Sequence, residues 1–192
     1  MSETLVDPVP TLAGARCRLR ALQPHDAVAL QRHADDPQVA YNLFDGFPQP
    51  YTLAHAQAWC GTEHRLARYG HVWGIELDHE EVAGCISVAP QGGLWRCSAV
   101  VGYWIGRACW GRGIVADALQ QVTAWTWASL PEITRLWAPF YARNAASQQV
   151  ARKAGYVQEG FMPYSILHKG QAIHAVAWGS YRPGLPRPEG RS

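Results

Sequence analysis

One stretch of the sequence, residues 98–121, constrains the fold more than any other. It begins with an apolar, β-branched and aromatic run over 98–105 and continues through a loop that contains Gly111 and Gly113. It ends in a segment with helical spacing that starts at residue 114. Runs of the first kind form buried strands, and segments of the last kind form helices with one apolar face. The stretch therefore predicts a strand, a glycine loop and a helix in direct succession.

The two glycines give this loop a chemical use. Because they lack a Cβ, Gly111 and Gly113 can adopt backbone conformations that other residues avoid, so consecutive amide N–H groups can turn toward one point. That point lies at the N-terminus of the predicted helix, where unpaired amides and the helix dipole favour an anion such as a pyrophosphate. Arg112 adds positive charge beside it. A tight turn that binds nothing is the alternative, and the spacing alone does not decide between them.

Two nucleotide-binding motifs fit the loop less well. Gly111, Gly113 and Ala116 match the G-x-G-x-x-G/A pattern of dinucleotide sites, and Glu132 follows at a suitable distance. A dinucleotide loop opens directly after its strand, however, whereas residues 106–110 intervene here, and Glu132 precedes the next predicted strand instead of ending it. The loop also lacks Gly-Lys-Ser/Thr, which excludes a nucleotide P-loop.

Composition argues against several classes of protein. The chain has 192 residues, 48% of them hydrophobic, which suffices for one domain over residues 1–182 followed by a disordered tail over 183–192. A net charge of +2 without basic clusters argues against nucleic acid and membrane surfaces as partners. We expect neither a signal peptide nor a membrane span, and therefore a cytoplasmic location. The histidines and cysteines lack metal-ligand spacing, so we expect no metal.

The remaining periodicities predict a single mixed α/β domain in which consecutive strands over 71–105 form an antiparallel meander. The aromatic segment from Tyr41 to Tyr51 is expected to be a structured loop that meets a ligand or caps the core. Tyr41, Phe44 and Ser98 are the candidate substrate contacts. Expected strands lie at 16–20, 71–78, 82–89, 94–105, 133–141, 156–162, 165–167 and 172–180, and expected helices at 24–34, 53–67, 114–129 and 145–154.

Four motifs occur in a fixed order between residues 12 and 178. They are Gly14-Ala15-Arg16-Cys17-Arg18-Leu19-Arg20 with Asp26, Gly102-Tyr103-Trp104-Ile105, Trp110-Gly111-Arg112-Gly113, and Asn144-x-x-Ser147 followed by Lys153-Ala154-Gly155-Tyr156. Each motif is weak alone. Together they resemble the GNAT superfamily of N-acetyltransferases, and within it the RimJ/RimL-like branch of ribosomal-protein N-terminal acetyltransferases.

The resemblance implies a mostly antiparallel mixed sheet with a splayed central strand and flanking helices, and acetyl-CoA as the acetyl donor. The pantetheine would pair with the backbone of Trp104 and Ile105, and the pyrophosphate would lie on the amides of residues 110–116. The family usually begins this loop with Gln or Arg where this chain has Ala108. The implied cofactor-binding residues are Trp104, Ile105, Arg107, Trp110, Gly111, Arg112, Gly113, Ile114, Val115, Ala116 and Asn144.

The same resemblance assigns the chemistry to Ser147 and Asn144. Many family members use a Tyr seven residues after the Asn to protonate the leaving thiolate, but that residue here is Ala151. In this branch a Ser three residues after the Asn takes that place, so Ser147 would donate to the sulfur while Asn144 holds the pantetheine or a water. Without the family, a helix cap formed by Asn144, with Ser147 in the first turn of the helix, is the favoured explanation of both residues.

The general base is not evident. The family often has a Glu where this chain has Val100, and the other candidates for holding a water chain are Ser98, Glu76, His71 and Glu159. The expected activity is transfer of an acetyl group to a primary amine, which is either a protein N-terminus or a small molecule such as a drug or polyamine. An amine of low pKa is favoured because more of it is neutral. A non-catalytic acetyl-CoA sensor is the alternative, and a homodimer remains open.

Overall fold

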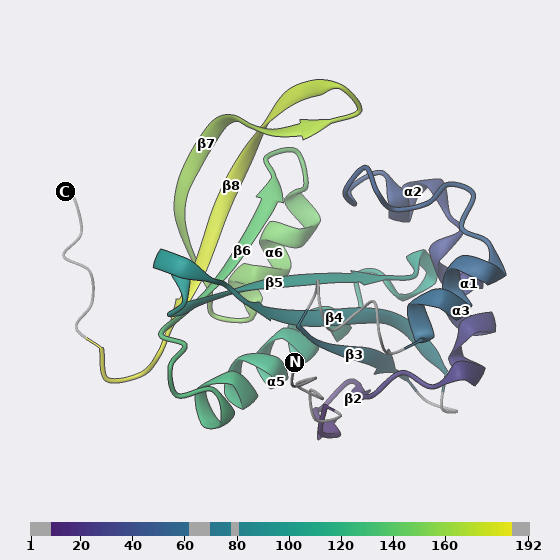
Figure 1. Ribbon diagram of the computed structural model, residues 1–192, viewed down its shortest axis with the longest axis horizontal. Coiled ribbons are helices and arrows are strands. Elements are labelled where there is room, and N and C mark those ends of the chain that lie inside the picture. The colour runs from purple at the N-terminus through teal and green to yellow at the C-terminus, as the bar shows by residue number, and fades with distance from the viewer. Residues whose placement is uncertain (1–8, 62–69, 78–80, 186–192) are drawn as a thin grey trace, which may run out of the picture.

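The computed structural model describes residues 9–61, 70–77 and 81–185. One sheet of eight strands has the order β1-β2-β3-β4-β5-β6-β8-β7, with helices on both faces (Figure 1). The strands are β1 (Leu12–Ala13), β2 (Arg18–Arg20), β3 (His71–Glu76), β4 (Val82–Pro90), β5 (Ser98–Ile105), β6 (Arg135–Tyr141), β7 (Val157–His168) and β8 (Gln171–Tyr181). The helices are α1 (Ala27–Ala34), α2 (Pro37–Ala40), α3 (Leu53–Cys60), α5 (Ile114–Ser129) and α6 (Ala145–Lys153), with short 3-10 turns η1 (Pro24–Asp26), η3 (Gly93–Trp95) and η4 (Arg107–Cys109).

Strand β5 lies in the middle of the sheet and has two different neighbours. It pairs antiparallel with β4 along Ala99–Ile105, and parallel with β6 over only three residues, Ser98–Val100. Parallel pairing requires a crossover connection, and α5 provides it. Beyond Val100 the strands separate, and β6, β8 and β7 rise away from β5 (Figure 1). The mixed α/β fold and the splayed central strand are thus confirmed.

The two faces of the sheet are covered by different helices. On one face, α5 packs with Leu119 and Val122 against strand residues such as Trp73 and Ile75. On the other, α1 and α3 pack with Leu30 and Ala56 against Val72 and Cys85. Because successive strand residues point to opposite faces, Val72 and Trp73 belong to different clusters. The β3–β4–β5 meander and the helix over 114–129 are confirmed.

Several predicted boundaries are wrong. The expected strand over 94–105 begins only at Ser98, because Gly93 has a positive φ of 60° and starts the turn η3, in which Leu94 and Trp95 are exposed. Strand β1 was not expected. The two strands expected over 156–162 and 165–167 form one strand, β7, with irregularities in its pairing with β8. Thr52 does cap α3, but this helix ends at Cys60; the rest of its expected range to residue 67, and residues 186–192 of the expected disordered tail, lie outside the described residues.

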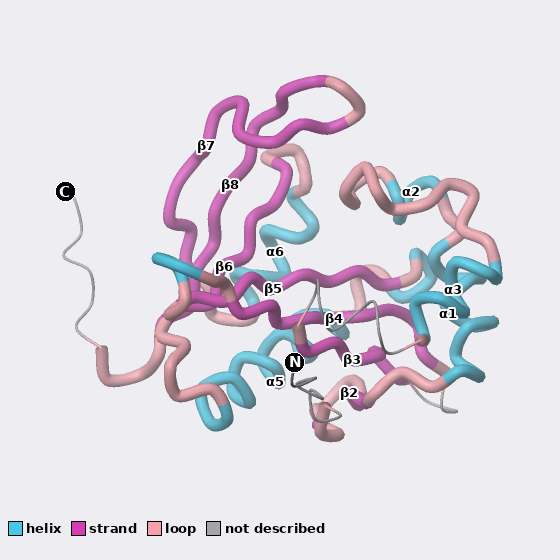
Figure 2. Tube along the Cα trace, in the orientation of Figure 1, coloured by secondary structure: helices cyan, strands magenta, loops and turns pink. Residues whose placement is uncertain are grey.

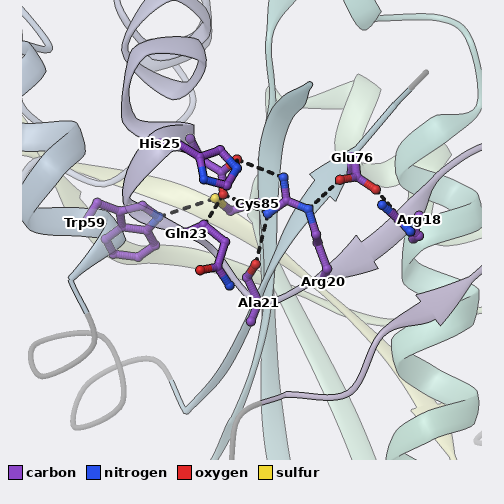
Figure 3. Close-up of polar contacts among 9 residues, drawn as sticks. Arg18, Arg20, Ala21, Gln23, His25, Trp59, Glu76 and Cys85 are labelled. Carbon is purple, nitrogen blue, oxygen red and sulfur yellow. Dashed lines mark hydrogen bonds and ion pairs between the residues drawn. The ribbon is translucent and has the colours of Figure 1, made fainter. Parts of the chain in front are cut away.

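A buried ion-pair network fastens the first strands to η1. Arg20 contacts Glu76, and Glu76 also contacts Arg18 (Figure 3). The guanidinium of Arg20 donates to both carboxylate oxygens of Asp26 at 2.8 Å. Asp26 is 3% exposed and also accepts from the amide of Gln23 at 2.7 Å. Burial alone raises the pKa of Asp26, but the hydrogen bonds from Arg20 and Gln23 outweigh it, so the net pKa is lowered.

Replacing Asp26 with Asn should therefore destabilise the fold in a pH-dependent way. Breaking a buried pair leaves Arg20 without part of its counter-charge, at a cost of about 3 kcal/mol at pH 7. A carboxylate with a lowered folded-state pKa stabilises the protein above its unfolded pKa of about 3.9 and loses this contribution as the pH falls further. Urea unfolding at pH 7 and near pH 3 should show the difference shrinking. An equal difference at both pH values would contradict this role.

Candidate active site

A cleft of about 1150 Å³ opens where β5 and β6 separate. Its walls come from β4, β5, the loop that follows α2, the start of α5 and one face of α6. Crevices at the carboxyl end of a central strand, beside a change in strand order, are frequent ligand sites. The splay of two strands therefore coincides with a large hollow among the described residues, larger than the hollow beside residues 13–18.

The glycine loop lies at one end of this cleft and has the backbone conformation that the sequence predicts. Gly111 and Gly113 both have φ of 76°, in the left-handed region that favours glycine. Gly113 is the N-cap of α5 and no side chain caps this helix. The first turn therefore presents the amides of Ile114, Val115 and Ala116, which have no partner within the described part of the chain, to the cleft that these residues line.

An aspartate holds the opposite side of the same helical turn. The carboxylate of Asp117 accepts from the amides of Ala15 and Arg16, each at 3.1 Å. Partial burial by itself raises the pKa of Asp117, but these hydrogen bonds lower the net pKa, so the group stays ionised. These bonds fix the loop between β1 and β2 against the first turn of α5. The first motif, over residues 14–20, thereby holds the helix end that follows the glycine loop.

The free edge of β5 is formed by Tyr103 and Ile105. The carbonyl of Trp104 points toward β4, where it would lie 2.2 Å from a Cβ on Gly84. Backbone groups alternate between the two sides of a strand, so those of Tyr103 and Ile105 face the separating β6. The indole N–H of Trp110 donates to the Ile105 carbonyl at 3.0 Å. A ligand along this edge would thus meet backbone groups of Tyr103 and Ile105, and the expected backbone contact through Trp104 is not available on this side.

Asn144 and Ser147 meet at the N-terminus of α6. The Asn144 Oδ1 accepts from the Ser147 amide at 3.1 Å, and its Nδ2 donates to the Ser147 Oγ at 2.9 Å. Asn144 therefore is a helix cap, as the simpler interpretation held. The same geometry leaves the hydroxyl proton of Ser147 free to be donated elsewhere, because its oxygen already accepts a hydrogen bond. Ala151, in contrast, is fully buried.

Tyr103 connects β5 to this pair. Its hydroxyl donates to the main-chain carbonyl of Ser147 at 3.0 Å. Burial raises the pKa of Tyr103, so its hydroxyl keeps its proton. The sequence offered one signal for this residue, since Tyr103 lies within the motif that precedes the loop. The sequence analysis did not single out Tyr103, because only the register of β5 against β4 shows which residues face the opening between β5 and β6.

Most of the predicted site residues line this one cleft, and four do not. Arg107 is exposed on η4, and Arg112 lies beside Arg16 at a separate hollow, where its carbonyl accepts from Arg16 at 3.2 Å. Tyr41 lies on the outside under Arg143, and Ser98 is buried at the far end of β5. The predicted residues that do line the cleft are Phe44, Trp104, Ile105, Trp110, Gly111, Gly113, Ile114, Val115, Ala116, Asn144 and Ser147.

No aspartate or glutamate is found among the described residues that line the cleft. The candidate bases have other roles: Glu76 pairs with Arg18 and Arg20, and Glu159 pairs with Arg135. His71 packs against Trp125 at 4.8 Å between ring centroids. Val100, at the position where the family often has a carboxylate, contributes only an apolar side chain to the wall.

The fold places unpaired helix amides and a free strand edge in one cleft. In a comparison with known proteins, the family model described as acetyltransferase (GNAT) domain matches residues 16–157. The chain therefore belongs to the GNAT acetyltransferase family, and it is an acyltransferase that uses acetyl-CoA. None of the helices in the described segments is long and apolar enough to cross a membrane.

Solved structures share the fold at low sequence identity. RimL, a ribosomal L7/L12 alpha-N-protein acetyltransferase in complex with coenzyme A, is 20% identical with a TM-score of 0.75, covering 90% of this chain and 98% of that chain. RimJ of Mycobacterium smegmatis is 22% identical with a TM-score of 0.76, covering 93% and 90%. The microcin C7 self-immunity acetyltransferase MccE, solved with acetyl-CoA and AMP, is 16% identical with a TM-score of 0.73, covering 87% and 93%. No curated protein sequence matches this chain.

Substitution of Gly113 tests the anion site. Gly113→Asp should weaken coenzyme A binding by about 30-fold or more, because a carboxylate would repel the pyrophosphate and disturb the amides of α5, at a cost of about 2 kcal/mol. Isothermal titration calorimetry measures this loss. The matched control is Gly170→Asp, since Gly170 has a φ of 75° and lies in the β7–β8 turn outside the cleft. Equal affinities of the two variants would contradict the placement.

Proposed function

We propose that this protein transfers the acetyl group of acetyl-CoA to a primary amine in the cleft between β5 and β6, in the manner of the RimJ/RimL-like branch. One observation supports this most directly: the unpaired amides of α5 and the Asn144–Ser147 pair open into the same hollow. The donor supplies an activated thioester when it is bound. The unpaired amides fit its pyrophosphate, and the free edge of β5 fits the amide groups of its pantetheine.

Ser147 has the role of proton donor in this proposal. Its hydroxyl oxygen accepts from Asn144, so its own proton is available to the departing sulfur. Asn144 acts as a positioning residue, because its amide holds both the hydroxyl and the first turn of α6. Tyr103 donates to the main-chain carbonyl of the same serine, so Ser147 is held through both its side chain and its main chain.

The acceptor must reach the cleft as a neutral amine. The described lining contains no carboxylate to remove a proton, and Val100 cannot do so. An α-amine has a pKa near 8 and is partly neutral at physiological pH, whereas a lysine side chain with a pKa near 10.4 is almost entirely charged. The site therefore favours an amine of α-amino type, on a peptide N-terminus or on a small molecule.

Ser147→Ala should reduce turnover much more than binding. Loss of a positioned proton donor lowers kcat by about 100-fold, while the Asn144 cap on the residue-147 amide persists and coenzyme A affinity changes little. Thiol release measures kcat, and calorimetry measures affinity. The matched control is Ser165→Ala. Ser165 lies on β7 outside the cleft lining, and its hydroxyl donates to the carbonyl of Met162. If the Ser147 variant turned over like this control, the cap would be the whole role of the pair.

The pH dependence of the reaction should follow the acceptor. Without a carboxylate base, kcat/KM should rise about tenfold per pH unit up to the amine's own pKa and then level off. For two acceptors whose amine pKa values differ, the pH at which kcat/KM levels off should differ by the same amount. Val100→Glu should extend activity to lower pH, and Val100→Gln, which has a similar size and no charge, should not. A profile that ignored the acceptor's pKa would indicate an enzymic base.

A further inference from the structure

A histidine at the tip of the β7–β8 hairpin contacts the loop over residues 41–51. His168 is 7% exposed, and its Nδ1 lies 3.0 Å from the Oδ1 of Asp45 in that loop. Because a carboxylate only accepts hydrogen bonds, the ring nitrogen is the donor. The main-chain amide of Lys169 donates to the other oxygen of Asp45 at 2.7 Å. Figure 2 shows the loop that follows α2 facing the tip of the hairpin. We refer to these two contacts of Asp45 as the Asp45–His168 clasp.

The hairpin turn is shaped for this contact. His168 pairs with Gln171 across a two-residue turn of Lys169 and Gly170, whose φ angles are 49° and 75°. Turns with two positive φ angles are ordinarily built from Asn, Asp and Gly, and a lysine is strained in the first position. The strained residue is the one whose amide donates to Asp45. Strain of this kind persists where surrounding contacts hold it, and it clusters at functional positions.

The loop that the clasp holds is part of the cleft wall. Leu43 before Asp45 and Gly46 after it line the cleft, whereas Asp45 and His168 themselves lie outside its lining. A change in the clasp therefore reaches the cleft through the position of the loop.

Tyr141 joins the loop to the residues of the proposed chemistry. Its hydroxyl donates to the Leu43 carbonyl at 3.0 Å, and its oxygen lies 3.1 Å from the Nδ1 of His168. Burial and the nearby charge of Asp45 raise the pKa of Tyr141, so the hydroxyl keeps its proton. The main-chain carbonyl of the same tyrosine accepts from the amide of Asn144 at 2.8 Å. The loop is thus fixed relative to the cap of α6.

Stability alone does not account for the clasp. The Nε2 of His168 is buried and has no hydrogen-bond partner within the segments that the structure describes, which costs free energy. The side chain of Asp45 is 43% exposed, and pairs with a partner so open to water contribute little to stability. What the clasp provides is a defined position of the loop above the cleft.

Building on the proposed function, we propose that Asp45 and His168 are positioning residues for the acceptor: their contact holds the loop over residues 41–51 against the hairpin, so that the acceptor amine is held between this loop and the Asn144–Ser147 pair. Loss of the contact lets the loop move away, and the amine then meets the thioester in a poorer orientation. Coenzyme A lies on the glycine loop and the edge of β5 in the proposed function, so its affinity does not depend on the clasp.

Substitutions that move one donor test this role. With the whole chain, acetyl-CoA and alanine amide as the acceptor, His168→Ala should lower kcat/KM about tenfold, mainly through KM, and leave coenzyme A affinity unchanged. His168→Asn should retain most of the activity, because the asparagine Nδ2 takes the place of the ring Nδ1. His168→Gln, whose amide nitrogen takes the place of the other ring nitrogen, should behave like His168→Ala. Thiol release measures the kinetics, and calorimetry measures the affinity.

A second histidine of the same hairpin provides the matched control. The ring of His174 accepts from the amide of Tyr164 at 3.1 Å, within β7 and β8 and outside the cleft lining, so His174→Ala should change neither kcat/KM nor affinity. Adding His168→Ala to Asp45→Ala should cost no more than Asp45→Ala alone, because the two residues share one contact. Equal effects of the Ala substitutions at 168 and 174, or of Asn and Gln at 168, would overturn the inference, as would a parallel loss of coenzyme A affinity.

Hydrogen exchange separates this inference from the proposed function. The amides of Leu43 and Phe47 are hydrogen-bonded to the carbonyls of Ala40 and Phe44. Without any acceptor, they should exchange about tenfold faster in His168→Ala than in the wild-type and His174→Ala proteins. Unchanged exchange would refute the clasp whether or not the enzyme turns over. Coenzyme A binding without thiol release from alanine amide, a peptide N-terminus or a polyamine would refute the proposed function, and the exchange rates would still decide whether the clasp holds the loop.

Discussion

The early separation of β5 from β6 is the constraint on which the rest of this structure depends. A parallel pair is ordinarily buried and continuous, but here it lasts only from Ser98 to Val100. The remaining length of β5 keeps its hydrogen bonds to β4 and leaves its other edge without a strand partner. Buried backbone groups need partners, so this edge is stable only because it opens into a cleft where water or a ligand can pair with it.

The same separation brings two helix N-termini to one place. The crossover helix α5 must begin just after β5 ends, and α6 begins just after β6 ends, so both present their first turns to the widening gap. They differ in how these turns are satisfied: α5 has a glycine cap with no side-chain bond, whereas Asn144 caps α6. The uncapped turn suits an anion, and the capped turn holds a hydroxyl in a fixed direction.

The sequence predicted local geometry well and register poorly. The positive φ angles of Gly111 and Gly113 were predicted, and the cap at Asn144 was one of two interpretations; all three features follow from the chemistry of single residues. The direction of the Trp104 carbonyl depends on pairing with β4, and one step of register exchanges its role with that of Tyr103 or Ile105. Ser98 was a candidate substrate contact, yet only the sheet shows that it is buried at the far end of β5.

Three acidic residues that were candidate bases or belong to the first motif have structural roles in this fold. Glu76, Asp26 and Glu159 are all paired with arginines, and an ion pair of this kind lowers a carboxylate's pKa and makes it a poor base. Val100, at the position where the family often has a carboxylate, has no charge at all. These three carboxylates thus hold the fold together, and in the proposed reaction the acceptor arrives neutral. A cleft lining without a described aspartate or glutamate is consistent with that requirement, because no such carboxylate can take a proton from the amine and the reactive fraction is then set by the acceptor's own pKa.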